Sequence, residues 1–396
     1  MHLGIINYGT RAKNRGVDQL AQCLYQLGHQ ALIVARLPKS GERITEFNNI
    51  PILQLPLNVK RFGYLISAPI PLNWIWTRWI VYFARKYSWQ AIFVREVPLA
   101  WQVLRAAKIL DIPAYLDMRE NLGAMYAAGS EERLIRKFLR PKRFVHFYES
   151  LVVPKFNHVF TVSQELRIWV TENYKIKPNV ISVLSNYPSQ VFLEQAEKAA
   201  KKKIKRSHEK VLKLVHTGFV KKDRGLQDIL KALRILIDRE INVALRIIGD
   251  GTNLNDLKEL VSQLGIEKHV EFLPMLPPEN VADALADCDV GLCSYLLNEH
   301  TQQTLPGKLF EYMAVGLPVL SSARKPVISI IEKEKCGFIY YSRDPEAIAN
   351  AIISLTKDLN NAREMGRRGR EAVIKRYNQK SNLEVLRKVL EKNNTV

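Results

Sequence analysis

Blocks of apolar and polar residues along the chain predict strands and helices in turn. Near the N-terminus, the apolar run "LGIINYG" (3–9) predicts a buried strand, and "VDQLAQCLYQLG" (17–28) carries apolar residues at helical spacing. The polar loop "TRAKNRG" (10–16) lies between them, and a second strand, "HQALIVA" (29–35), follows. This order of strand, glycine loop, helix and strand is typical of parallel sheets covered by helices.

The same order returns in the second half of the chain. "LKLVHTG" (212–218) predicts a strand, "FVKKDRG" (219–225) a loop, "LQDILKALRILIDRE" (226–240) a helix and "NVALRIIGDG" (242–251) the next strand. Both loops end in the pair Arg-Gly. Two such starts predict an α/β protein with two Rossmann-like, doubly wound domains.

Further apolar runs complete the expected organisation. They predict strands in the segments 91–96, 112–120, 270–276, 290–295 and 317–322. We expect an N-terminal domain over 1–188 and a C-terminal domain over 189–375. The amphipathic tail in 376–396 predicts a helix that packs back on the N-terminal domain, and the basic run 198–210 predicts a solvated surface element.

Composition narrows the class of partner. The chain has 396 residues and a formal net charge of +20, which indicates an acidic partner: nucleic acid, anionic lipid or a phosphorylated substrate. The basic residues are dispersed, and the sequence carries no RNA-binding signature or helix-turn-helix, so we expect no nucleic acid.

The compartment follows from cysteines and apolar stretches. The chain has four cysteines and no CxxC pair, which indicates small buried hydrophobic residues in a reducing compartment. The N-terminus lacks the features of a signal peptide, and the apolar stretch 62–77 is too short and too interrupted by proline to span a bilayer. We therefore expect a cytoplasmic protein, either free or on the cytoplasmic face of a membrane.

The segment "LPGKLFEYMAVGLPVLSS" (305–322) suggests a ligand site. An ordinary buried helix has no need of an acid at Glu311 among Leu309, Phe310 and Met313. The pattern fits a helix that begins near Gly307 and points its amide end at an anion. Glu311, one turn further on, would then accept hydrogen bonds from hydroxyl groups.

Several motifs together resemble a known family. "HTGFVKKDRGLQDILKAL", "RIIGDG", "VEFLPML", "ADCDVGLCSY" and "PGKLFEYMAVGLPVL" occur in the order seen in retaining glycosyltransferases of family 4. The N-terminal half agrees more weakly, through "DMRENL" and "YESLVVPKFNHVFTVSQEL". The resemblance implies the GT-B fold, with two Rossmann-like domains facing each other across a deep cleft. It also implies a UDP- or GDP-sugar donor on the C-terminal domain and an acceptor that approaches from the N-terminal domain.

The resemblance assigns roles to residues of the donor side. It implies that Glu311 holds the ribose hydroxyls. Many family members carry a Glu where this chain has Gln303, and Arg and Lys where it has Phe219 and Arg224. Lys308 is our candidate for the missing cation. These departures leave diphosphate binding in place and put the identity of the donor sugar in question.

The expected chemistry is stabilisation of the departing diphosphate. Arg224 and Lys308 are the predicted catalytic cations, which together with helix N-termini stabilise this charge without a metal or other cofactor. Gly16 and Gly218 let the backbone approach the diphosphate, or else are only turn residues. The remaining predicted donor contacts are Gly249, Gly251, Leu273, Gln303, Thr304 and Gly307.

Two further groups of acidic residues bear on a metal ion and on the acceptor. Asp287 and Asp289 spell the acidic doublet of metal-dependent glycosyltransferases, but they close a helix and lead into a buried strand, so we predict no metal. Asp117, Arg119 and Glu120 follow a strand at the edge where open sheets bind ligands. They either orient the acceptor hydroxyl, with Asp117 and Glu120 as catalytic candidates, or form a local ion pair. We name no general base.

The positive charge suggests a surface partner. The segments 74–89 and 131–144 combine aromatic residues with Arg and Lys, as at a lipid headgroup interface, or else their aromatic residues belong to the core. We expect a glycan or lipid-linked acceptor in polysaccharide, lipopolysaccharide or glycolipid assembly. Two alternatives remain: a nucleotide-sugar epimerase of the same fold, and a catalytically silent scaffold, which Gln303 and Phe219 keep open.

Overall fold

The computed structural model divides the chain into two units. One comprises Met1–Asn186 with Lys380–Val396, and the other comprises Tyr187–Gln379. The expected boundary between residues 188 and 189 lies close to this division. The structure describes residues 1–8, 15–36, 45–47, 49–55, 73–128, 141–203, 211–341 and 343–394.

The first unit is built on an 8-stranded sheet with the order β3-β4-β2-β1-β5-β6-β7-β8 within the described residues. Its strands are β1 (His2–Asn7), β2 (Gln30–Arg36), β3 (Glu46–Phe47), β4 (Ile50–Leu55), β5 (Ala91–Arg95), β6 (Ala114–Met118), β7 (His158–Thr161) and β8 (Ile181–Val183). All pair in parallel except β3 with β4.

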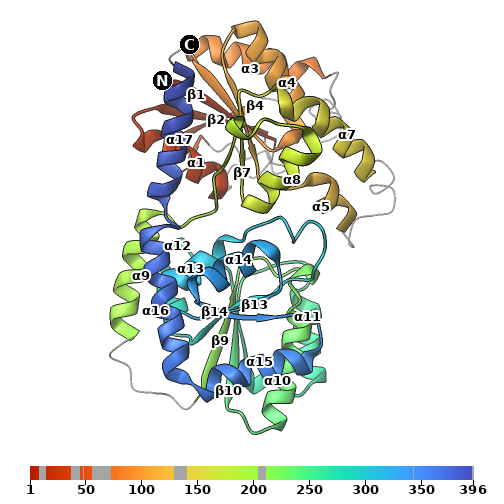
Figure 1. The fold of residues 1–396 in the computed structure, drawn as a ribbon, viewed down its shortest axis with the longest axis vertical. Helices are drawn as coiled ribbons and strands as arrows, with labels where there is room; N and C mark the ends of the chain where they lie inside the picture. The colour runs from red at the N-terminus through yellow and green to blue at the C-terminus, as the bar shows by residue number, and fades with distance from the viewer. Residues whose placement is uncertain are drawn as a thin grey trace. The chain divides into compact units, whose positions relative to one another are not determined.

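Helices cover this first sheet (Figure 1). They are α1 (Arg15–Gln26), α3 (Trp74–Lys86), α4 (Ala100–Leu110), α5 (Leu122–Ala128), α7 (Lys142–Val152), α8 (Gln164–Tyr174) and α17 (Gln379–Asn394). α17 places Leu386, Val389 and Leu390 in one core with residues of β1, α1 and β2. The C-terminal helix is therefore part of the first unit.

Within the described residues, the second unit contains a parallel 6-stranded sheet with the order β11-β10-β9-β12-β13-β14. Its strands are β9 (Leu212–Thr217), β10 (Val243–Ile248), β11 (Val270–Leu273), β12 (Val290–Cys293), β13 (Val319–Ser322) and β14 (Gly337–Tyr340). Its helices are α9 (Gln190–Lys203), α10 (Leu226–Asp238), α11 (Leu254–Gln263), α12 (Pro278–Ala286), α13 (Gly307–Ala314), α14 (Lys325–Glu334), α15 (Pro345–Lys357) and α16 (Leu359–Lys375).

Both sheets have the topology that the repeated sequence pattern predicts. β1 lies between β2 and β5, and β9 lies between β10 and β12, so the direction of strand addition reverses beside the first strand of each unit. Open α/β sheets bind ligands at the carboxyl ends of the strands at such reversals. The prediction of two Rossmann-like sheets is confirmed.

The predicted elements lie close to the observed ones, with some exceptions. The five further predicted strands correspond to β5, β6, β11, β12 and β13. β3, β4, β7 and β14 were not predicted individually. The loop 10–14 and the basic segments 131–140 and 204–210 lie outside the described residues. In the described part of the chain, no helix combines the length and apolarity needed to cross a bilayer.

Candidate functional site

The loop after β9 is shaped by glycines. Gly218 has a φ of 106°, in the left-handed region. A Cβ atom on Gly249 would lie 1.9 Å from the carbonyl oxygen of Gly218, and one on Gly251 would lie 2.1 Å from that of Val220. Gly249 and Gly251, both predicted to contact the donor, thus let the backbone of residues 218–220 approach closely.

Helix α13 carries Lys308 and Glu311, and Tyr312 fixes its position. The Tyr312 hydroxyl accepts a hydrogen bond from the Thr217 backbone N–H at 3.0 Å and donates one to the Leu292 carbonyl at 3.3 Å. The helix is thereby tied to the carboxyl ends of both β9 and β12. As predicted, it begins at Gly307.

Lys308 lies beside the glycine loop. Its amine is 3.3 Å from Nε2 of the fully buried His216 and would be 3.8 Å from a Cβ atom on Gly218. Burial, and then the nearby charge of Arg224, lower the pKa of Lys308 to about 7. Burial also holds the pKa of His216 well below its usual value, so the neutral imidazole accepts the hydrogen bond from the amine.

Three cations meet the ring of Tyr295, which follows β12. The guanidinium carbon of Arg324 lies 4.0 Å from the ring centre, that of Arg224 lies 4.4 Å away, and the Lys308 amine lies 5.5 Å away. Arg224 also pairs with Asp223 at 3.3 Å. Since this is the only carboxylate within ion-pair distance of the three among the described residues, the site is strongly electropositive. We call these residues the Tyr295 cation site.

Glu311 lies on α13, about one turn after Lys308, with 7% of its surface exposed. An ionised carboxylate at this position on the helix can accept hydrogen bonds from neutral hydroxyls. In the loop before the helix, Gln303 is 8% exposed and Thr304 is half-buried. Leu273, at the end of β11, accepts a hydrogen bond from the Gly249 N–H at 3.0 Å.

The structure brings together only part of the predicted donor set. Gly218, Arg224 and Lys308 are neighbours. Gly249 and Gly251 lie against the backbone of the loop after β9, and Leu273 is hydrogen-bonded to Gly249. Gly16 belongs to the first unit and lies in the first turn of α1.

The acidic doublet at 287 and 289 has structural partners. Asp287 pairs with Arg246 at 3.1 Å, and Asp289 accepts a hydrogen bond from the Lys213 N–H at 2.9 Å. Asp289 precedes β12, at the edge of the sheet opposite the Tyr295 cation site. Among the described residues, no group of three or more His, Cys, Asp or Glu side chains is arranged to hold a metal ion.

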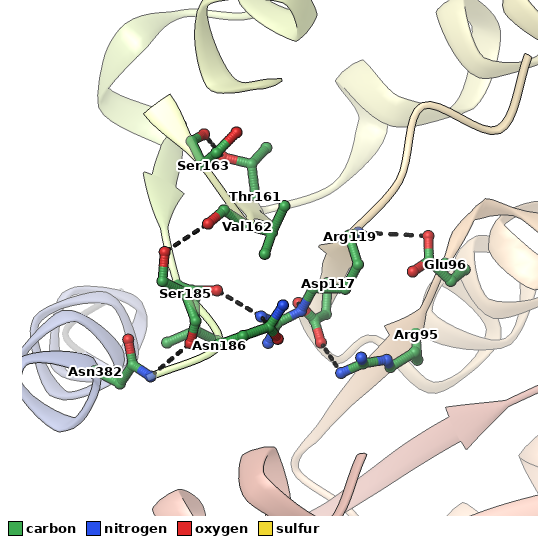
Figure 2. A network of polar contacts seen from close by, with 11 residues as sticks. Arg95, Glu96, Asp117, Arg119, Thr161, Val162, Ser163, Ser185, Asn186 and Asn382 are labelled. Carbon is green, nitrogen blue, oxygen red and sulfur yellow. Dashed lines mark hydrogen bonds and ion pairs between the residues drawn. The ribbon is translucent and has the colours of Figure 1, made fainter. Parts of the chain in front are cut away.

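In the first unit, Asp117 joins two arginines (Figure 2). Its fully buried carboxylate pairs with Arg95 at 2.9 Å and with Arg119 at 2.6 Å. Arg95 lies directly opposite Asp117 in the β5–β6 register. Both carboxylate oxygens therefore belong to a buried ion-pair network, which matches the ion-pair interpretation of this segment.

Arg119 extends the network to the end of the sheet (Figure 2). Its Nη1 donates to the Leu184 carbonyl at 2.6 Å and to Asn186 Oδ1 at 3.2 Å. Asn382 of α17 donates to the neighbouring Ser185 carbonyl at 2.9 Å. The predicted acceptor residue Arg119 thus anchors the segment through which the chain leaves the first unit.

Glu96 is a functional candidate that the sequence did not reveal. It follows β5 directly and has a φ of 65°, a conformation that is strained for glutamate and frequent at functional sites. Burial, and then the nearby charge of Glu120, raise the pKa of Glu96 to about 8. Glu96 and Glu120 therefore form an acidic pair at the carboxyl edge of this sheet.

Tyr295 and Arg324 were also missed. Each follows a strand, β12 and β13 respectively, at the carboxyl edge. The only available signal was their place at the end of the predicted strand 290–295 and shortly after the predicted strand 317–322, which many loop residues share.

Comparisons with known proteins agree with this geometry. Residues 14–187 match the family model described as glycosyl transferase 4-like domain, and residues 197–372 match the model of glycosyl transferases group 1. The two matches together cover most of the chain. The chain belongs to glycosyltransferase family 4.

Two curated proteins match about half of this chain or less. The chain is 28% identical over 204 residues to N-acetyl-alpha-D-glucosaminyl L-malate synthase from Bacillus anthracis, covering 51% of each protein. It is 27% identical over 170 residues to a putative colanic acid biosynthesis glycosyltransferase, WcaL, from Escherichia coli K12, covering 42% of each. These matches therefore span about half the length of the curated relatives, or less.

One solved structure shares the fold over nearly the whole length of this chain. The Anabaena protein Alr3699/HepE, crystallised with UDP and glucose, superimposes with a TM-score of 0.73 at 14% identity, covering 99% of this chain and 100% of that one.

Proposed function

We propose that the chain transfers a sugar from a nucleoside-diphosphate sugar to an acceptor hydroxyl, with retention of anomeric configuration. The observation that carries this proposal is the approach of Arg224 and Lys308 to one ring at the carboxyl edge of β9 and β12. Glu311 lies about one turn beyond Lys308, which suits a ligand with an anionic part next to neutral hydroxyls. A nucleoside diphosphate has this chemistry, and the HepE structure was solved with UDP.

In this proposal, Arg224 and Lys308 act on the leaving group of the donor. As the sugar–phosphate bond breaks, negative charge develops on the diphosphate, and Arg224 and Lys308 stabilise it at fixed positions. The N-terminus of α13 adds the positive end of its dipole. Because side chains supply this charge, the reaction proceeds without a divalent metal. Glu311 holds the ribose hydroxyls.

Donor binding and transfer test this function directly. Calorimetry with UDP and GDP should identify one nucleoside diphosphate that binds. Incubation of the corresponding sugar donors with membrane extract should yield a sugar-modified acceptor by mass spectrometry, and NMR of the product should show the donor's anomeric configuration. Absence of binding to every nucleoside diphosphate would indicate a silent scaffold. Conversion of the donor without any acceptor would indicate an epimerase.

We further propose that α3 and α4 contact an anionic membrane near a lipid-linked or glycan acceptor. The two helices contain no acidic residue and carry Arg78, Arg85, Lys86, Arg105 and Lys108. Their surface includes a hollow of about 580 Å³, lined by three of these cations together with Tyr82 and Ile109, of which 51% and 55% are exposed. Aromatic residues and cations in one patch suit phospholipid headgroups.

Vesicle sedimentation tests this surface. The double variant Arg78→Glu/Arg85→Glu should lose binding to vesicles that contain phosphatidylglycerol. The matched control Arg387→Glu/Lys388→Glu makes the same change of net charge at exposed positions of α17 and should retain it. Equal binding by both variants, or binding that does not depend on salt, would contradict the proposal.

A further inference from the structure

Arg324 is a buried cation without a counter-charge among the described residues. It lies directly before α14 and is 0% exposed. Among the described residues, its Nε and Nη1 have no hydrogen-bond partner and no carboxylate lies within ion-pair distance. Its Nη2 lies 3.9 Å from the Cys293 sulfur, a weak acceptor.

Such an arrangement is costly in the protein alone. A buried charge without a counter-ion retains a large desolvation penalty, and unsatisfied N–H groups add to it. Stacking on the ring of Tyr295 offsets only part of this cost. A bound anion with two oxygen atoms would satisfy both the charge and the free N–H groups, because guanidinium pairs with such anions through two hydrogen bonds.

The position of Arg324 indicates which ligand supplies the anion. Its guanidinium contacts the same ring as Arg224 and Lys308. The side chain of Gln302 also fixes the flanking backbone: its Oε1 accepts from the Lys325 N–H at 2.8 Å. Arg324 is therefore held beside the predicted diphosphate cations and next to the loop that carries Gln303.

We propose that Arg324 binds an anionic group of the donor and completes, with Arg224 and Lys308, a three-cation site. This inference rests on the proposed function and adds Arg324 to Lys308, the candidate for the cation that Phe219, 48% exposed, does not supply. The anionic group is either the diphosphate, common to all donors, or a carboxylate on the transferred sugar. Because Tyr295 covers the guanidinium, binding includes a displacement of this half-buried ring.

Calorimetry on the full chain tests the proposal. Wild type, Arg324→Met and Arg324→Lys are titrated with uridine, UDP, inorganic pyrophosphate, UDP-glucose and UDP-glucuronate, or with the guanosine series if GDP is the ligand. If the diphosphate is bound, Arg324→Met weakens UDP and pyrophosphate at least tenfold and leaves uridine unchanged, and Arg324→Lys recovers part of the loss. If a sugar carboxylate is bound, only the glucuronate weakens. Lys325→Met, an exposed neighbour, is the matched control and should bind as wild type.

Two results would overturn the inference. One is unchanged binding of every ligand by Arg324→Met. The other is a large loss of thermal stability in unliganded Arg324→Met while Arg324→Lys binds normally, since this indicates a structural charge. If wild type itself binds neither the nucleotides nor pyrophosphate, it is the proposed function that fails.

Discussion

The amine of Lys308 lies 3.3 Å from Nε2 of His216, and this contact joins the start of α13 to β9. The neutral imidazole of His216 accepts a hydrogen bond from the Lys308 amine but provides no negative charge to balance it. The protonation of Lys308 near neutral pH therefore depends on whether an anionic ligand is bound.

Donor affinity should fall as pH rises above 7. The pKa of Lys308 is lowered to about 7, so the free enzyme loses this charge above that pH, whereas a bound diphosphate raises the pKa. Binding then takes up a proton, and affinity decreases by up to about tenfold per pH unit. Calorimetry between pH 6.5 and 9, in buffers of different ionisation enthalpy, measures the uptake. Lys308→Arg, which stays charged, should show a flatter profile, and an equal slope in both proteins would contradict the prediction.

Glu311→Gln should weaken nucleoside diphosphate binding. Hydrogen bonds to a charged group contribute about 1.5–3 kcal/mol, so we expect roughly a tenfold to hundredfold loss. Pyrophosphate has no ribose and should bind as before. Calorimetry with both ligands checks this, and Glu332→Gln, at an exposed position of α14, is the control. A loss of pyrophosphate affinity equal to that of the nucleotide would remove the ribose assignment.

Gly249→Ala should destabilise the chain. The added Cβ atom would lie 1.9 Å from the Gly218 carbonyl oxygen, so the loop after β9 must shift. We expect a loss of about 2 kcal/mol or more in the free energy of unfolding. Gly265→Ala, with a φ of 63° and open space around it, should cost only about 1 kcal/mol. Urea unfolding compares the two variants, and equal losses would show that the close approach does not matter.

Asp117→Asn should lower the stability of the folded chain. The substitution removes the counter-charge of two buried arginines and should cost about 3–5 kcal/mol. Asp111→Asn, at an exposed position before β6, removes the same charge and should cost little. Thermal unfolding and donor turnover are measured together. If Asp117→Asn keeps its stability but loses turnover, the residue acts on the acceptor instead.

Local pattern was sufficient for much of the fold. The apolar runs of β1, β5, β9 and β12 and the helical spacing of α10 could be read directly, because buried strands and amphipathic helices leave periodic signals. β3 spans only Glu46–Phe47 and leaves no such signal.

The site was harder to predict because the residues that contact one another in it are far apart in the sequence. Asp117 meets Arg95 only through the register of β5 and β6, and a sequence cannot separate this ion pair from a ligand-binding acid. Tyr295 and Arg324 meet because β12 and β13 are adjacent. The helix of Glu311 was identifiable because its acid interrupts an apolar stretch within a single element.

The placement of α17 has a consequence for synthesis of the chain on the ribosome. The Tyr187–Gln379 unit is contiguous and has its full complement of residues before the rest of α17 is translated. The unit that includes Met1 lacks Leu386, Val389 and Leu390 until α17 has been translated, so its core is incomplete up to that point. The Tyr187–Gln379 unit is thus the first of the two to have all its residues, although translation of the other unit starts earlier.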